Sequence, residues 1–170
     1  MSISLLRKSR LICERFVDHL GSSISISNET SLPENLRETQ PLLFSAACLL
    51  ASRFLPEVTK HTVNGMYAQV RRLTASVLLN APPLDYETLQ ALLLLSMWSP
   101  TVQMAAPIDS WLLSSIALNH SILSFDFLDG EGTVDMSEDT FREMRIWNGL
   151  CATQLQYSRH LCILETALTI

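Results

Sequence analysis

Apolar residues return at intervals of three and four along most of this sequence, and this spacing restricts the fold more than any other feature. Such a period places the apolar residues on one side of an α-helix, whereas a β-strand needs alternation at every second position. No strand-length alternating run competes with the helical pattern. We therefore predict an all-α fold, a bundle of about six helices packed on one another.

Turn-forming residues separate the segments that carry this pattern. Gly21 ends the first segment, and the Ser-rich stretch 22–39 that follows is predicted to be a loop or linker. Asp109 and Ser137 are predicted N-caps, because their side-chain oxygens can accept a hydrogen bond from an amide of the first helical turn. The predicted helices span about residues 4–20, 41–54, 60–79, 85–98, 109–123 and 137–157.

Three of these helices differ in how their apolar residues are distributed. Leu89–Leu95 is apolar around most of its circumference, so this helix is predicted to be central. The helix from Asp109 has two apolar arcs, which predicts contacts on two sides. One arc holds Leu112, Leu113, Ile116, His120 and Leu123, and the other holds Trp111, Leu118 and Ile122. The apolar stripe of the last helix consists of Phe141, Met144, Trp147, Leu150, Cys151 and Leu155.

The composition is rich in apolar residues for a chain of this length. Of its 170 residues, 48% are hydrophobic and 17% are charged, against about 25% charged in an average soluble domain. Either a partner covers part of the surface or the chain is a piece of a larger protein. The net charge of −5 argues against a duplex-DNA binder, which usually carries a clustered basic face.

Neither the N-terminal residues nor the uncharged middle of the chain indicates a membrane protein. The N-terminal basic residues follow the apolar ones, and Glu14 and Asp18 interrupt any apolar run, so no signal peptide is predicted. Residues 88–108 lack charge, but Pro100 and Pro107 leave about ten continuous apolar residues where a span needs about 20.

No motif of catalysis, phosphate binding or metal binding is present. The four cysteines, at 13, 48, 151 and 162, do not form a C-x-x-C pair and are predicted to be reduced, buried thiols. The carboxylate pairs Glu14/Asp18 and Asp139/Glu143 are interpreted as solvated surface residues. We predict no catalytic, cofactor-binding, metal-binding or DNA-binding residues, no cofactor, and no enzymatic activity.

Three tryptophans and one histidine are the candidate effector-site residues. Trp98, Trp111 and Trp147 are interpreted as core anchors, and the alternative is that they line an apolar ligand pocket. His120 lies on an apolar arc and is interpreted as a core histidine, with a place beside such a pocket as the alternative.

Four motifs occur in an order that resembles a known family. They are Pro41–Phe54, ending in Ala-Ser-Arg-Phe; Leu84–Leu95, with Thr-Leu-Gln-Ala-Leu-Leu-Leu-Leu; Asp109–Leu118, with Ser-Trp-Leu-Leu; and Arg145–Leu150, with Arg-Ile-Trp. This set is similar to the regulatory middle-homology region of fungal zinc-cluster transcription factors. Ser115 stands where that family commonly has glycine.

The resemblance implies an all-helical regulatory domain of a nuclear transcription factor. The family's zinc cluster needs six closely spaced cysteines, so this chain is expected to lack it and to make no direct DNA contact. The family also usually continues after the Arg-x-Trp helix, so we interpret the chain as a partial version of the domain. Residues 1–40 are predicted to form an N-terminal helix and linker, and residues 41–170 the incomplete helical domain.

Two functions are compatible with this interpretation. The first is a transcription-regulator fragment that acts through a protein partner or self-association of its exposed apolar helices, with a small-molecule effector as a further possibility. The alternative is a small-molecule-binding helical sensor with no role in transcription, located in the cytoplasm rather than the nucleus.

Overall fold

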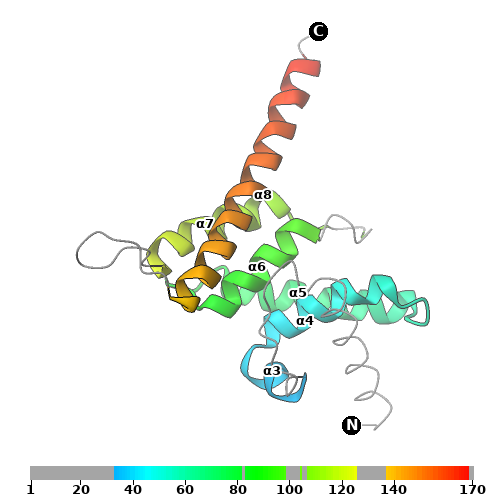
Figure 1. Ribbon diagram of the computed structural model, residues 1–170. Helices are drawn as coiled ribbons and strands as arrows, with labels where there is room; N and C mark the ends of the chain where they lie inside the picture. Colours follow the sequence, from blue (N-terminus) through cyan, green and yellow to red (C-terminus); the bar gives the residue numbers. More distant parts are fainter. Residues whose placement is uncertain (1–32, 82, 99–103, 105–106, 126–136, 169–170) are drawn as a thin grey trace. The chain divides into compact units, whose positions relative to one another are not determined.

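The computed structural model of the chain describes residues 33–81, 83–98, 104, 107–125 and 137–168 (Figure 1). Every regular element among these residues is helical, which confirms the predicted all-α class. The chain divides into two compact units, one formed by residues 1–81 and 101–107 and the other by residues 82–100 and 108–170. The predicted helix over residues 4–20 lies outside the described residues.

The first unit contains α3 (Pro33–Thr39), α4 (Pro41–Ala51), the short 3₁₀ helix η2 (Ser52–Phe54) and α5 (Lys60–Val77). Helix α4 packs against both α3 and α5. Helix α3 lies within the stretch predicted to be a loop, so that prediction is wrong for its last seven residues. The reason is that so short a helix has no repeated apolar stripe, and α3 instead begins at a proline and packs on α4.

The described core of the first unit comes mainly from α4, in which every residue from Ala46 to Ala51 is buried. Helix α5 begins at Thr59, whose hydroxyl accepts a hydrogen bond from the amide of Thr62 at 3.3 Å. Its buried residues are Tyr67, Val70 and Thr74. Tyr67 and Val70 belong to the apolar stripe that the sequence predicts for this helix, which consists of Val63, Met66, Tyr67, Val70, Leu73 and Val77.

The second unit contains α6 (Tyr86–Trp98), α7 (Ser110–Ser124) and α8 (Glu138–Leu168), and each packs against the other two. Helix α6 is buried from Leu89 to Ser96, as its nearly uniform apolar circumference predicted. In Figure 1 the C-terminal part of α8, drawn in orange to red, continues well past α6 and α7. The helix continues beyond residue 157 to Leu168, an extension that the sequence pattern had left open.

Side-chain caps begin the helices of this unit. Asp85 accepts a hydrogen bond from the amide of Thr88 at 2.7 Å, and Asp109 accepts one from the amide of Leu112 at 2.9 Å. The N-cap predicted at Asp109 is thereby confirmed.

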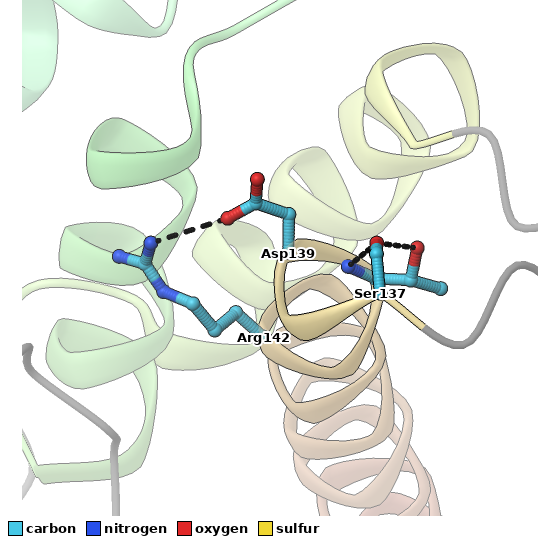
Figure 2. A network of polar contacts seen from close by, with 4 residues as sticks. Ser137, Asp139 and Arg142 are labelled. Carbon is cyan, nitrogen blue, oxygen red and sulfur yellow. Dashed lines mark hydrogen bonds and ion pairs between the residues drawn. The ribbon is translucent and has the colours of Figure 1, made fainter.

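Ser137 confirms the second predicted cap, at the start of α8. Its hydroxyl accepts a hydrogen bond from the amide of Thr140 at 3.2 Å and lies 2.9 Å from the Thr140 hydroxyl (Figure 2). Figure 2 also shows Asp139 in an ion pair with Arg142, at 3.5 Å on the same helix face. Acidic residues in this first turn also interact favourably with the helix dipole.

Two contacts show that α6 and α8 run in the same direction. Near the start of both helices, the Arg142 guanidinium lies over the Tyr86 ring, 4.7 Å from its centroid. Further along both helices, the Tyr157 hydroxyl donates a hydrogen bond to the Ser96 carbonyl at 3.0 Å.

Helix α7 runs in the opposite direction to its two neighbours. Near its C-terminal end, the Ser124 hydroxyl donates to the Leu84 carbonyl, just before α6, at 2.9 Å. Near its N-terminal end, Ser114 and Ser115 lie at 2.7 and 3.1 Å from the Gln154 side chain of α8. The unit is therefore an up-down-up arrangement of three helices.

A glycine marks the closest approach of α6 to α8. A Cβ placed on Gly149 would lie 2.9 Å from Cδ2 of Leu93, which is shorter than real carbon contacts, and Leu93 is itself buried. At Gly65, in the exposed interior of α5, the same added atom would meet nothing within 4 Å. The two helical glycines therefore have different roles, close packing at Gly149 and none at Gly65.

We expect Gly65→Ala to raise the free energy of unfolding by about 0.5–1 kcal/mol, because alanine favours a helix over glycine. Gly149→Ala makes the same local gain but displaces Leu93, and overpacking a core typically costs about 1–3 kcal/mol. Urea unfolding monitored by circular dichroism measures both. Equal stabilisation by the two substitutions would contradict the close α6–α8 contact.

Candidate interaction surface on α7 and α8

The side of α7 that faces its neighbours is lined mostly by small residues. Its buried residues are Ser110, Leu113, Ser114, Ala117 and Ser121. The hydroxyls of Ser114 and Ser121 lie 2.9 and 2.8 Å from the carbonyls of Trp111 and Leu118 in the same helix. Because the helix itself supplies acceptors, burying these hydroxyls does not leave unpaired polar groups. Small residues also let the helix backbones approach closely.

The large apolar residues of α7 lie instead on its outer sides. The exposed fractions are 42% for Trp111, 57% for Ile122 and 63% for Leu123, and Leu112 is exposed as well. The prediction that both apolar arcs of this helix are in contact is wrong for these four residues. The pattern identified the arcs correctly, but the serines and alanine between them form the packed side. No residue of α7 is an aspartate, glutamate, lysine or arginine.

Helix α8 also leaves part of its apolar residues uncovered. Its packed side contains Ile146, Leu150 and Thr153, all buried. Of the six apolar residues named for this helix, Leu150 is buried, Phe141 is exposed and Leu155 is 70% exposed. The other three are half-buried, so only part of this set belongs to the core.

Helical geometry places part of these outward residues on one surface. Successive residues turn by about 100°, so Trp111, Leu118 and Ile122 share one side of α7. On α8, Gln154 marks the side toward α7. Four of the six apolar residues of this helix, Met144, Trp147, Cys151 and Leu155, lie beyond Gln154, away from α6. We call this surface the α7–α8 strip. It consists of Trp111, Leu118 and Ile122 on α7 and Met144, Trp147, Cys151 and Leu155 on α8.

The strip is uncharged and only partly covered. Leu118, Met144, Trp147 and Cys151 are half-buried, and the other three members are exposed. Burying a large apolar side chain from water contributes about 1.5–3 kcal/mol. An uncharged apolar surface of this kind is the usual signature of an interaction site.

A polar contact beneath the strip holds α7 against α8. The hydroxyls of Ser114 and Ser115 each lie 2.9 Å from the Trp111 carbonyl as well as next to the Gln154 amide. A hydroxyl has one proton, so it cannot donate to both groups. The Gln154 side-chain oxygen Oε1 lies within hydrogen-bonding distance of both serine hydroxyls, 2.7 Å from Ser114 and 3.1 Å from Ser115, so each hydroxyl can donate to this oxygen or to the Trp111 carbonyl. Gln154 of α8 therefore contacts two residues of α7 at once.

At the other end of the unit, Arg142 links α8 to α6 through the ring of Tyr86. Burial raises the pKa of the Tyr86 phenol above its ordinary value of 10.0, and the charge and hydrogen bond of Arg142 partly oppose this rise. The neutral phenol is therefore favoured in the folded state. This preference for the neutral phenol adds to the free energy of unfolding below pH 10. The added stability is lost as the pH rises through the raised pKa of Tyr86.

The predicted effector-site residues all lie in the second unit, but at two levels along it. Trp98 ends α6 and Trp111 begins α7, at the end of the unit where Gln154 joins the helices. His120 lies nine residues after Trp111, about 13 Å along the axis at 1.5 Å per residue. Counting back from Gln154 places Trp147 near the level of His120. The four residues therefore do not converge on one point, and their role as a pocket stays a prediction.

One atom among these residues has an unusual environment. Within the described part of the chain, the only buried side-chain nitrogen or oxygen atoms that lack a hydrogen-bond partner are Nδ1 of His120 and Oγ1 of Thr74. Sequence reasoning singled out His120 from its position on an apolar arc. It missed Gln154, Tyr86 and Arg142, since a lone polar residue in an amphipathic helix carries no signal of its contact.

The described residues hold no cluster of three or more histidines, cysteines, aspartates or glutamates arranged for a metal ion. Of the predicted buried thiols, Cys48 is buried and Cys151 is half-buried, while Cys13 lies outside the described residues. None of the described helices is both long enough and apolar enough to cross a membrane.

Comparison with known proteins defines the class as a transcription-factor middle domain. The matching family model is described as the middle domain of the transcriptional activator of proteases prtT, and it covers residues 3–164. The chain therefore belongs to the prtT-like middle-domain family. This confirms the resemblance found in the sequence, and because the family is one of transcription factors, the chain is not an enzyme.

Three relatives illustrate the match. The transcriptional activator of proteases prtT of Aspergillus fumigatus is 48% identical over 149 residues, 87% of this chain and 21% of that protein. Its namesake from Aspergillus niger is 43% identical over 148 residues, 86% of this chain and 24% of that protein. An uncharacterized transcriptional regulatory protein of Schizosaccharomyces pombe is 28% identical over 166 residues, 91% of this chain and 31% of that protein. The chain thus spans less than a third of each. No solved structure matches.

Removing the Gln154 link should destabilise the fold. In Gln154→Ala the two serine hydroxyls lose an acceptor at the helix interface, and we expect the free energy of unfolding to fall by about 1–2 kcal/mol. Gln156→Ala, at an exposed position of the same helix, should change it by less than about 0.5 kcal/mol. Urea unfolding measures the difference. Equal effects would show that the hydrogen bonds between Gln154 and the two serines do not stabilise the fold.

Alkaline pH should weaken the fold through Tyr86. We expect the free energy of unfolding of the wild-type chain to decrease as the pH rises above 10, because burial raises the pKa of this phenol. Tyr86→Phe should show a smaller decrease over the same range, and Arg142→Gln should shift the Tyr86 pKa further upward. Urea unfolding and phenolate absorbance against pH measure these effects. An unchanged pH profile in Tyr86→Phe would rule out this contribution.

Proposed function

We propose that the chain is the regulatory middle domain of a nuclear activator of protease genes and that it acts through protein contact at the α7–α8 strip. The observation that carries this proposal is the exposure of large apolar residues on one uncharged side of α7 and α8, among them Trp111, Ile122 and Leu155. The names of the Aspergillus relatives support the protease genes as targets.

Stability alone does not account for this placement. Exposed Ile122 and Leu155 contribute little to the packing of their own unit, and both lie on the uncharged strip. A partner surface that covers them would remove apolar area from water, and this burial contributes about 25 cal/mol of favourable free energy per Å². The strip therefore suits a function in which the domain gains or loses a protein contact.

The proposal also assigns different functions to different parts of the longer protein. The relatives are at least three times as long as the segment they share with this chain. DNA recognition belongs to another part of such a protein, since the four cysteines of this chain cannot build the family's six-cysteine cluster. Residues 1–40 would precede the helical domain as a helix and linker, apart from α3, which packs on α4.

Effector sensing is a second candidate, and His120 favours it. Its Nδ1 atom is buried without a hydrogen-bond partner. A small molecule that donates a hydrogen bond to this nitrogen would supply the missing partner. Such a ligand would act on the same three-helix unit that presents the strip.

Adjacent residues of α7 offer a matched test in the full-length activator. Ile122→Glu places a charge in the strip, whereas Leu123→Glu places one on a similarly exposed residue that points about 100° away. We expect Ile122→Glu to reduce protease-gene transcripts in the fungus and Leu123→Glu to leave them near the wild-type level. Immunoblotting of nuclear fractions confirms equal amounts of both variants.

Two results would contradict the proposal. Equal transcript levels in Ile122→Glu and wild type would contradict a role of the strip in activation. Absence of the wild-type protein from the nucleus would contradict the proposed nuclear localisation. Loss of transcripts in both variants would show that α7 tolerates a charge at neither position. That result would also exclude a role specific to the strip.

A further inference from the structure

We propose that Thr74, in the last turn of α5, is a phosphorylation site for a basophilic serine/threonine kinase, and that its phosphate keeps this turn from packing on α4. The inference goes beyond the proposed function, because it concerns the first unit and does not involve the α7–α8 strip. Two independent observations meet at this residue, namely the sequence before it and the environment of its hydroxyl.

The sequence before Thr74 has the form that basophilic kinases recognise. Arg71, Arg72 and Leu73 precede it, so arginines stand three and two positions before the acceptor hydroxyl. Such kinases bind these guanidinium groups with carboxylates, through charge-assisted hydrogen bonds. Both arginines are exposed, and neither forms an ion pair with another described residue. A kinase therefore has to displace only the hydrogen bonds of Arg72 to the exposed Gln69 side chain, at 3.1 and 3.3 Å.

The hydroxyl of Thr74 is one of the two buried side-chain polar atoms that lack a hydrogen-bond partner among the described residues. Thr74 is 3% exposed and lies on the same side of α5 as Tyr67 and Val70. By contrast, the nearby Ser76 hydroxyl donates to the Leu73 carbonyl at 2.7 Å, the usual way in which a helix satisfies a hydroxyl. A buried hydroxyl without such a bond lowers stability, and a valine of the same shape would not. Packing alone therefore does not explain a threonine at this position.

The position of Thr74 at the end of α5 gives a kinase access to the buried hydroxyl. The helix ends at Val77, and the amide of Leu78 donates to the Thr74 carbonyl at 3.0 Å. The chain then continues through residues 79–81, which are exposed. Helix ends fray, and opening one terminal turn requires less free energy than unfolding the whole domain. The site is therefore cryptic, closed in the packed state and accessible when the last turn opens.

The modification uses ATP as the phosphate donor. The Thr74 oxygen forms a bond to the γ-phosphorus of ATP, and the bond between that phosphorus and its bridging oxygen breaks, so that ADP leaves with the electron pair. The hydroxyl proton passes to a base of the kinase. The product carries a charge of about −1.5 to −2 at pH 7.

A phosphate on Thr74 is incompatible with the packed state of α5. Helix α4, on which α5 packs, has no charged residue and is buried from Ala46 to Ala51. A phosphate held against it would lose its hydration without gaining a counter-charge from α4. In the last turn of α5, the negative end of the helix dipole also repels a phosphate. Both effects act in the same direction, so phosphorylation holds the last turn of α5 open.

Phosphorylation of the purified chain by the catalytic subunit of cyclic-AMP-dependent protein kinase with ATP tests the site. We expect mass spectrometry to locate the phosphate on Thr74 and not on the exposed Ser76. The double variant Arg71→Gln/Arg72→Gln should lower the rate at least about tenfold, because it removes two charge-assisted contacts with the kinase. Ser76→Ala should resemble wild type. All three substituted residues are exposed, and circular dichroism confirms that the variants are folded.

A peptide of residues 68–80 provides the rate for the same sequence without the fold. We expect the peptide to be phosphorylated at least about tenfold faster than the chain, because only the fraction of molecules with an open turn exposes Thr74. Equal rates would contradict the cryptic state of the site. A chain that acquires no phosphate on Thr74, while the peptide acquires it there, would overturn the proposal.

Hydrogen exchange of the phosphorylated chain tests the effect on packing. We expect the amides of residues 70–80 to exchange at least about tenfold faster than in the unmodified chain, and those of α7 to be unchanged. Thr74→Val, which keeps the shape of the side chain and lacks the acceptor, should stay unphosphorylated there and exchange no faster than wild type. Unchanged exchange of residues 70–80 after phosphorylation would overturn the release of this turn from α4.

Discussion

The close packing of helix backbones in the second unit is the constraint on which its other features depend. Gly149 lets α8 approach Leu93 of α6, and Ser114, Ala117 and Ser121 provide a narrow packed side on α7. A core built from small side chains buries less apolar area per residue than one built from leucines. The unit compensates by satisfying its buried hydroxyls within the helices and by filling its centre with α6, which is buried on all sides.

Polar contacts then fix how the three helices align along their axes. Apolar packing alone tolerates sliding by a turn, because leucines and serines recur along each helix. The Gln154 amide has two serine partners at a single height, and Tyr86 and Arg142 fix the opposite end of the unit. These few groups therefore determine which residues share the outer surface, and the two halves of the strip stay level with each other.

Much of the fold could be predicted from the residues alone. The all-α class, the caps at Asp109 and Ser137, the central position of the leucine-rich helix and the family followed from periodicity and motif order. The short α3 could not be predicted, because seven residues hold no repeat. The contacts of α7 were predicted wrongly at four residues for a more general reason. Periodicity locates large apolar residues, but it does not show whether they face the interior or a surface kept for another protein.

The length of α8 has a mechanical consequence. The helix is held by α6 and α7 as far as Tyr157, and it continues unbroken to Leu168, about 16 Å further along its axis. A rigid rod clamped at one end converts a small rotation at the clamp into a larger displacement at its tip. A tilt of about 10° at Tyr157 would move the end of α8 by about 3 Å. A small change in the packing of α8 on its two neighbours would therefore displace the far end of the helix.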